Sequence, residues 1–289
     1  MIIAPDIWFY NLGIELFNVR RIAFSVFGIN IYMYGILIPL GVAAGYITAL
    51  IEAKRTGQKK EDYSDLLVIG IISAIIGLRL FFVIFNLDLF IHNPITIITG
   101  IRGGGLAIFG GIISSIAAVY FFARKRKLNV WRILDTCAPS FAIGQAVGRW
   151  GNFFNREAFG GFTDNIFAMR IISHQATGRI TPEISANTIM DRGVEYIQVH
   201  PTFLYESFFC LILFAALTFY RPRKNFEGEV FFLYLLGYGV IRFFVEGLRT
   251  DQLLLGAIPV SQLSALIIFI AALTAIPFIR IQGRKKIKP

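Results

Sequence analysis

Long apolar runs separated by short polar segments dominate this chain. The runs cover approximately residues 30–52, 65–87, 106–123, 133–150, 201–220, 229–248 and 258–279. Each has about the length that an α-helix needs to cross a hydrocarbon core of roughly 30 Å. The pattern predicts an all-α polytopic membrane protein with about seven transmembrane helices, in which residues 1–289 form a single integral membrane domain. The polar, glycine-containing stretch 151–199 lacks a spanning run and is predicted to form a small extracytoplasmic cap between spans four and five.

Composition and charge support this interpretation and orient the chain. Hydrophobic residues make up 56% of the sequence and charged residues only 16%, with a net charge of +10. A nucleic-acid-binding protein would carry its basic residues on a water-exposed face, among aromatic residues. Here they cluster in every second connecting segment, at residues 54–60, 124–127, 221–224 and 280–288. The positive-inside rule makes those segments cytoplasmic, so we expect the N-terminus outside and the C-terminus inside.

Five ionisable residues fall within the predicted spans: Arg79, Arg149, Glu206, Arg242 and Glu246. Such residues are costly in a bilayer and usually face a partner or a functional cavity. Ion pairing between helices explains any one of them, but three arginines against two glutamates leave positive charge over. Because guanidinium binds phosphate through a bidentate fork, the simplest expectation is a site for an anionic lipid headgroup.

Helical spacing brings several polar residues onto one face of a span. Tyr238, Arg242, Glu246 and Arg249 recur at intervals of four, four and three residues, which places them in one stripe. The G-x-x-x-G pair Gly144 to Gly148 suits close contact between helices rather than nucleotide binding. The three histidines of the chain lack metal-ligand spacing.

The polar run at the end of the fourth span carries a recognisable motif. Residues 148–160 read G-R-W-G-N-F-F-N-R-E-A-F-G. This run resembles the signature of the bacterial prolipoprotein diacylglyceryl transferases, G-R-x-G-N-F-x-N-x-E-x-x-G. Further matching segments spread the resemblance over nearly the whole chain, namely Tyr34-Gly35, Gly77 with Arg79, His200 to Glu206, and Tyr238-Gly239 with Arg242, Glu246 and Arg249.

The resemblance implies a reaction, two substrates and a location. The diacylglyceryl group of phosphatidylglycerol would move to the lipobox cysteine of a prolipoprotein, forming a thioether and releasing glycerol 1-phosphate. The site would face the outer leaflet of the bacterial cytoplasmic (inner) membrane, and no metal or organic cofactor is expected. The expected catalytic residues are Arg149, Arg242, Asn152 and Tyr34. The expected substrate-binding residues are Arg149, Asn155, Glu157, Gly160, Tyr238, Glu246, Arg249 and His200.

One residue departs from the family pattern. Members commonly carry histidine, sometimes tyrosine, immediately before the glycine pair at residues 110–111, but this chain has Phe109 there. Phenylalanine cannot accept a proton, so the general base is open, with Tyr34 and His200 as candidates. A catalytically silent relative and an anion transporter or channel are the alternatives. A phosphatidyltransferase of the CDP-alcohol class is disfavoured because no span carries its cluster of four aspartates.

Overall fold

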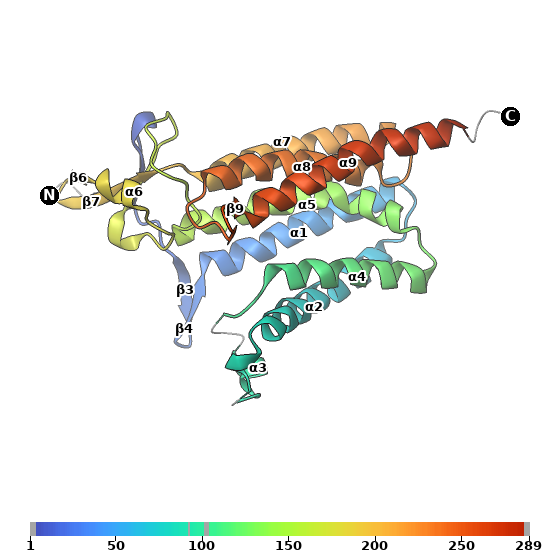
Figure 1. The fold of residues 1–289 in the computed structure, drawn as a ribbon, viewed down its shortest axis with the longest axis horizontal. Coiled ribbons are helices and arrows are strands. Elements are labelled where there is room, and N and C mark those ends of the chain that lie inside the picture. The colour runs from blue at the N-terminus through green and yellow to red at the C-terminus, as the bar shows by residue number, and fades with distance from the viewer. Residues whose placement is uncertain (1–3, 92, 101–103, 286–289) are drawn as a thin grey trace. The chain divides into compact units, whose positions relative to one another are not determined.

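A computed structural model describes residues 4–91, 93–100 and 104–285 (Figure 1). Residues 286–288 of the C-terminal basic cluster lie outside the described residues. The helices are α1 (Met33–Arg55), α2 (Lys60–Phe85), α3 (Thr96–Thr99), α4 (Ile108–Arg126), α5 (Val130–Asn155), α6 (Pro182–Ala186), α7 (Thr202–Tyr220), α8 (Glu229–Leu248) and α9 (Val260–Lys285). The strands are β1 (Ile7–Phe9), β2 (Ile14–Leu16), β3 (Ile22–Val26), β4 (Ile29–Tyr32), β5 (Met169–Ile172), β6 (Ile189–Asp191), β7 (Val194–Val199), β8 (Leu254–Leu255) and β9 (Ile258–Pro259).

Every predicted apolar run is helical over most of its length, although the first begins in strand β4 and the last in strand β9. Six helices in the described part of the chain are long and apolar enough to cross a membrane: α1, α2, α4, α7, α8 and α9. The fourth predicted span, α5, is 26 residues long but carries more polar residues, and it is not among them. On α2 the large side chains of Ile72, Ile75 and Ile76 are 53%, 50% and 52% exposed. Apolar surface of this kind requires a nonpolar solvent, so the chain is a multi-pass membrane protein.

The prediction of an all-α protein is wrong, because segments outside the apolar runs form sheets. The largest has the order β2-β1-β5-β7-β6, and its neighbouring strands pair antiparallel. The N-terminal strand β1 joins β5 with Ile7 opposite Ile171. These short strands, three to six residues long, are rich in β-branched and aromatic residues, which favour pleated structure. Their pattern was hidden among polar loop residues.

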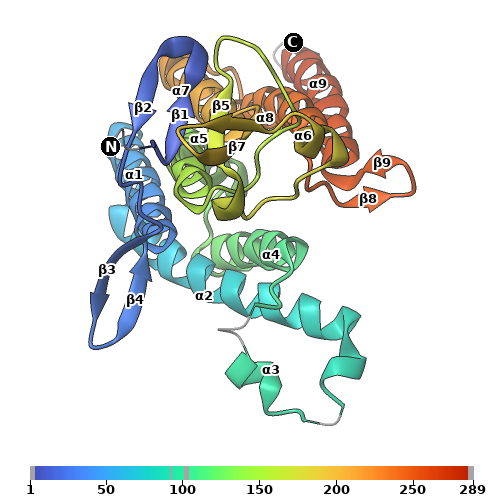
Figure 2. The ribbon, with the colours of Figure 1, turned by 90° about the vertical axis from the view of Figure 1, so that its left-hand side faces the viewer.

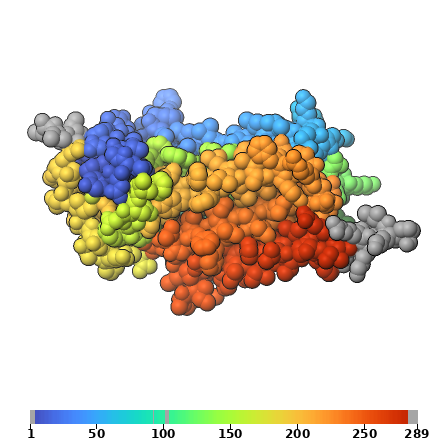
Figure 3. Space-filling view, turned by 90° about the horizontal axis from the view of Figure 1, so that it is seen from above, coloured from blue at the N-terminus to red at the C-terminus, as the bar shows by residue number. Residues whose placement is uncertain are grey.

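The chain divides into two compact units, Met1–Thr48 with Cys137–Pro289, and Ala49–Thr136. In the first unit the five-stranded sheet covers the ends of α5, α7 and α8 (Figure 2). Its core contains Ile7, Ile171 and Ile197 from the strands, packed with Phe153 of α5 and Phe203 of α7. The space-filling view shows the strands and their loops, blue and yellow, gathered at one end of the orange and red helices α7–α9 (Figure 3). Segments far apart in sequence thus meet where the sheet joins the helices.

Small residues allow close helix contacts in both units. A Cβ added at Gly41 or Gly45 of α1 would lie 2.8 Å from Gly144 O or 2.9 Å from Ser140 O of α5. The expectation that Gly144 serves helix contact is therefore confirmed. In the second unit Gly110 of α4 packs against Gly77 of α2 so closely that an added Cβ would overlap the Gly77 carbonyl.

Candidate active site

Three helices bring the predicted intramembrane charges of the first unit to the end covered by the sheet. Arg149 lies near the C-terminus of α5, Glu206 lies in the second turn of α7, and Arg242 and Glu246 lie in the last two turns of α8. Hydrogen bonds between the loop after α5 and the end of α8 fix this arrangement, including Gly161 N to Leu248 O at 3.0 Å. The predicted stripe on α8 therefore faces partners on the two other helices.

Glu206 is the centre of the arrangement. Its side chain is only 1% exposed, and its Oε1 lies 2.9 Å from Arg149 Nη2. The same oxygen accepts a hydrogen bond from the Tyr238 hydroxyl at 3.0 Å. The other carboxylate oxygen lies 3.4 Å from Arg242 Nη1. One buried carboxylate thus holds two guanidinium groups that come from different helices.

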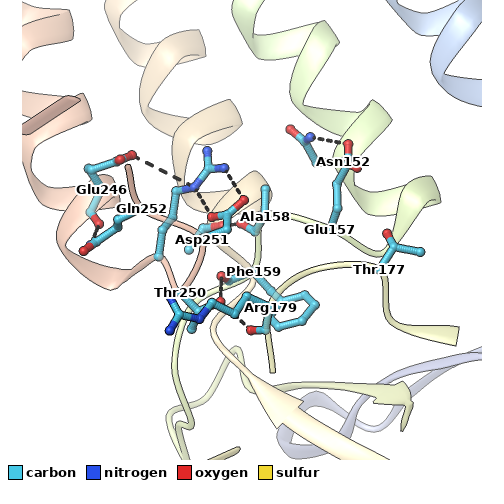
Figure 4. A network of polar contacts seen from close by, with 12 residues as sticks. Asn152, Glu157, Ala158, Phe159, Thr177, Arg179, Glu246, Thr250, Asp251 and Gln252 are labelled. Atoms are coloured by element: carbon cyan, nitrogen blue, oxygen red, sulfur yellow. Dashed lines mark hydrogen bonds and ion pairs between the residues drawn. The ribbon is translucent and has the colours of Figure 1, made fainter. Parts of the chain in front are cut away.

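The network continues along α8 and into the loop that follows it. Arg242 Nη2 lies 2.5 Å from Glu246 Oε2, and Arg249 Nε lies 4.0 Å from the same oxygen. Arg249 also donates to both oxygens of Asp251, at 2.9 and 2.8 Å, and Figure 4 shows Glu246 and Asp251 on either side of the arginine side chain that both contact. Burial alone would raise the pKa of the Asp251 carboxyl, but the paired guanidinium of Arg249 holds that pKa below its usual value.

On the other side, Arg149 is joined to the polar run after it. Arg149 Nη1 lies 3.4 Å from Asn152 Oδ1. The Asn152 amide donates in turn to Glu157 Oε1 at 2.9 Å (Figure 4), and Asn155 donates to the same oxygen at 3.2 Å. The two asparagines of the motif therefore hold one carboxylate, and the chain of polar contacts runs from Glu157 to Asp251.

The surplus arginine expected from the sequence is not part of this network. Arg149, Arg242 and Arg249 face Glu206, Glu246 and Asp251, so each cation has an anionic partner. The third intramembrane arginine, Arg79, belongs to the second unit. It is 7% exposed and donates to backbone carbonyls at Thr96, Ile97, Gly104 and Gly105, at 2.7 to 3.2 Å. Arg79 therefore organises a loop of its own unit.

The side chains of Arg149 and Arg242 are paired but not fully buried. The side chains of Arg149 and Arg242 are 22% and 18% exposed, whereas those of Glu206 and Glu246 are 1% and 3% exposed. Arginine has five N–H donors in a fixed fork. The buried carboxylates engage part of each fork and fix its orientation, while each arginine side chain keeps part of its surface exposed.

Tyr34 and Gly160 make close contacts with residues next to this network. The Tyr34 ring covers Gly151, where an added Cβ would lie 2.9 Å from Tyr34 Cε2. At Gly160 an added Cβ would lie 2.8 Å from both His200 Cβ and Leu248 O. Only glycine allows these close approaches.

His200 has neighbours of its own. Its Nδ1 lies 3.3 Å from Asn165 Nδ2 and 3.4 Å from the Tyr205 hydroxyl. Burial lowers the pKa of the imidazole, which favours the neutral ring. The structure thus gives His200 polar contacts outside the arginine network, although its backbone carbonyl accepts from Gly160 N at 3.0 Å.

Comparison with known proteins decides the family. The model of the family described as prolipoprotein diacylglyceryl transferase matches residues 21–278. The chain belongs to this family. A phosphatidylglycerol–prolipoprotein diacylglyceryl transferase of Finegoldia magna is 43% identical over 252 residues, which cover 87% of this chain and 92% of the relative. Relatives of the same name from Enterococcus faecalis and Bacillus cereus are 38% and 41% identical, over 94% and 85% of this chain and 97% and 87% of their own lengths.

Sequence reasoning missed two features of this prolipoprotein diacylglyceryl transferase family member. Glu206 was seen as an intramembrane charge but not as the central acceptor, because sequence spacing shows which face a residue occupies and not its partner. Asp251 follows Arg249 by two residues in a polar loop. An acidic residue so close to an arginine of the predicted stripe is the sequence feature that indicates this ion pair. Phe109 lies in the first turn of α4 in the second unit and is 37% exposed.

Proposed function

We propose that the chain transfers the diacylglyceryl group of phosphatidylglycerol to the lipobox cysteine of a prolipoprotein, the first step of bacterial lipoprotein maturation. The cysteine sulfur attacks the glycerol carbon that carries the phosphate ester. A C–S bond forms, the C–O bond to phosphate breaks, glycerol 1-phosphate leaves and the thiol proton is lost. Family membership and the names of the relatives support this proposal.

The observation that carries the proposal is the shared carboxylate between two arginines. Glu206 holds Arg149 and Arg242 at 2.9 and 3.4 Å with their side chains partly exposed. Charge develops on the departing phosphate during the reaction, and preorganised donors in a water-poor site stabilise such charge strongly. In our proposal the two guanidinium groups bind that phosphate, and no reorganisation is needed when the reaction occurs.

The remaining motif residues orient these two arginines or the substrates. Asn152 reaches Arg149 directly and would add a hydrogen bond to the lipid. Glu246 orients Arg242 from the same helix. Tyr34 and Tyr238 would position the substrates, and the remaining predicted substrate-binding residues would support the lipid headgroup: Asn155, Glu157, Gly160, His200 and Arg249.

Thiol activation requires a separate account because position 109 is phenylalanine. A free thiol has a pKa of about 8.5, so a few per cent is already thiolate at neutral pH. Positive charge near a thiol depresses its pKa. We propose that the guanidinium groups of Arg149 and Arg242 favour the thiolate of the bound prolipoprotein, with Tyr34 or His200 as alternative proton acceptors.

We further propose seven spans, with the N-terminus outside, the C-terminus cytoplasmic and the site toward the outer leaflet of the cytoplasmic membrane. Two features support this topology: α5 is long enough to span at 26 residues, and every lysine falls in segments assigned to the cytoplasm. An impermeant amine-reactive reagent added to intact cells is then expected to label no lysine. Labelling of Lys59 or Lys125 from outside would refute the orientation.

The decisive experiment supplies purified protein with phosphatidylglycerol and a lipobox peptide. The expected products are thioether-linked diacylglycerol on the peptide and free glycerol 1-phosphate. A peptide with Cys→Ser at the lipobox is the control and is expected to yield neither. An anion transporter or a catalytically silent relative would give no product with either peptide, which would overturn the proposal.

A further inference from the structure

The second unit contains a cavity that the proposed reaction does not use. It has a volume of about 350 Å³ and lies where the loops before α2 and between α4 and α5 come together. The charged residues that line it are Lys59, Asp62, Arg126, Lys127 and Arg132. All of them fall within Ala49–Thr136, so the cavity belongs entirely to one unit.

Part of the positive charge in this cavity is already neutralised. Arg126 lies 3.3 Å from Asp62 and 2.5 Å from Asp65. Arg132 donates to the Thr56 carbonyl at 2.5 Å. These contacts hold the two arginines at the rim through groups of the protein itself.

The two lysines differ from the arginines. Among the described residues, neither Lys59 nor Lys127 has a carboxylate within ion-pair distance, and both are exposed. Their backbones are nevertheless fixed, because Lys59 precedes the first turn of α2 and Lys127 ends α4 in a left-handed conformation with φ of 55°. Among the described residues, the charges of Lys59 and Lys127 thus have no carboxylate partner, and the charge of Arg132 is met only by a backbone carbonyl.

The backbone adds to this preference for an anion. Lys59 has extended geometry before the 26-residue helix α2, and its side chain makes no capping hydrogen bond to that helix. The N-terminus of a helix carries partial positive charge and unpaired donors. At the start of α5, by contrast, Asn129 Oδ1 accepts from Trp131 N at 2.9 Å.

The remaining lining is apolar. Leu66, Phe122 and Ile133 are buried beside the basic residues and contribute to the wall of the cavity. A basic pocket between spanning helices on the lysine-rich side is the arrangement that binds phospholipid headgroups. We infer that this cavity binds a phosphate group, supplied by an anionic phospholipid or by a soluble phosphate, through Lys59 and Lys127.

The test compares two double variants of the full chain that lose the same charge. Lys59→Gln with Lys127→Gln removes the free lysines of the cavity. Lys54→Gln with Lys125→Gln removes two exposed lysines that do not line it. Binding to each purified protein is measured in detergent by native mass spectrometry and by thermal protection, with phosphatidylglycerol, phosphatidylcholine and inorganic phosphate as separate probes.

We expect the cavity variant to bind phosphatidylglycerol about thirtyfold more weakly at one site, or about fivefold for each lysine, while the control variant matches the unmodified chain. Protection by phosphatidylglycerol that is lost in the cavity variant identifies a lipid headgroup, and protection by inorganic phosphate that is lost in the same variant identifies a soluble source. Equal loss in both double variants, or no loss in either, would overturn the inference. Transferase activity is measured separately, so failure here leaves the proposed reaction untouched.

Discussion

Replacing Glu206 with glutamine tests whether one carboxylate organises the site. Glutamine keeps the size of the side chain but removes the charge that Arg149, Tyr238 and Arg242 share. Its single carbonyl oxygen can accept a hydrogen bond from one arginine, while its NH₂ group, which is a donor, faces the other arginine. The two guanidinium groups then repel each other without a common anion between them.

The size of the effect follows from burial. Removing one partner of a buried ion pair costs about 3–5 kcal/mol, because a charge remains without compensation. The Arg149 and Arg242 side chains are 22% and 18% exposed, so water offsets part of this cost and about 2–4 kcal/mol remains. If that loss falls on the transition state, turnover slows by about thirty- to a thousandfold.

Measuring kcat and KM separately shows whether Glu206 orients the two arginines or only changes their attraction for the lipid phosphate. Loss of a negative charge strengthens the local positive potential, so the KM for phosphatidylglycerol is expected to stay constant or fall. The misaligned guanidinium groups are expected to lower kcat by about thirty- to a thousandfold. Both constants are measured with the purified variant and a lipobox peptide, after its insertion and yield have been compared with the unmodified chain.

Ser207→Ala is a matched control. Ser207 is the next residue of α7, is 3% exposed, and makes neutral hydrogen bonds to Ala146 O at 2.8 Å and from Trp150 Nε1 at 3.2 Å. Losing such bonds costs about 1 kcal/mol each in stability, and kcat should be nearly unchanged. An unaltered kcat in Glu206→Gln would refute the idea that this carboxylate orients the arginines.

Three further sets of substitutions test Arg242, Phe109 and Gly160. Arg242→Lys keeps the charge but loses the fork, so kcat should fall about thirty- to a thousandfold in protein that still inserts; near-normal turnover would reduce Arg242 to structural pairing. Phe109→Ala and Phe109→His should both retain activity, at a rate that rises with pH as the peptide thiol ionises. Loss of transfer in Phe109→Ala with intact lipid binding would rule out electrostatic activation of the thiol. Gly160→Ala should lower the yield of folded, active protein because its Cβ would lie 2.8 Å from a backbone carbonyl oxygen, while Gly161→Ala, whose Cβ would have no atom within 4 Å, should be tolerated. Detergent-soluble yield and specific activity are measured for both variants. Equal values for the two would contradict the close approach at Gly160.

The helices were the most predictable part of the fold. The sixth run, residues 229–248, coincides with Glu229–Leu248 of α8, because apolar length is a property of the local sequence. The stripe on that helix was also predictable from its spacing. The partners of the stripe were not, since the salt bridge from Arg149 to Glu206 joins residues 57 positions apart in the chain, on helices whose packing no local pattern specifies.

Long-range pairing limits prediction in two other places. The segment Met169–Ile172 reads as part of a polar loop region, yet it is a central strand with all four residues buried. Arg79 looked like an uncompensated membrane charge, but its guanidinium is satisfied by backbone carbonyls. Carbonyl groups occur at every residue, so a sequence gives no sign of which of them will serve as partners.

The pairing of β1 with β5 has a consequence for how the chain is made. Ile7 pairs with Ile171, about 160 residues later. At a synthesis rate of about 5–20 residues per second, the first strand emerges roughly 8 to 32 s before its neighbour exists. Throughout that interval one edge of β1 exposes unpaired N–H and C=O groups. Completion of the sheet is therefore a late event in biogenesis, and it ties the beginning of the chain to a segment that is made only after α5.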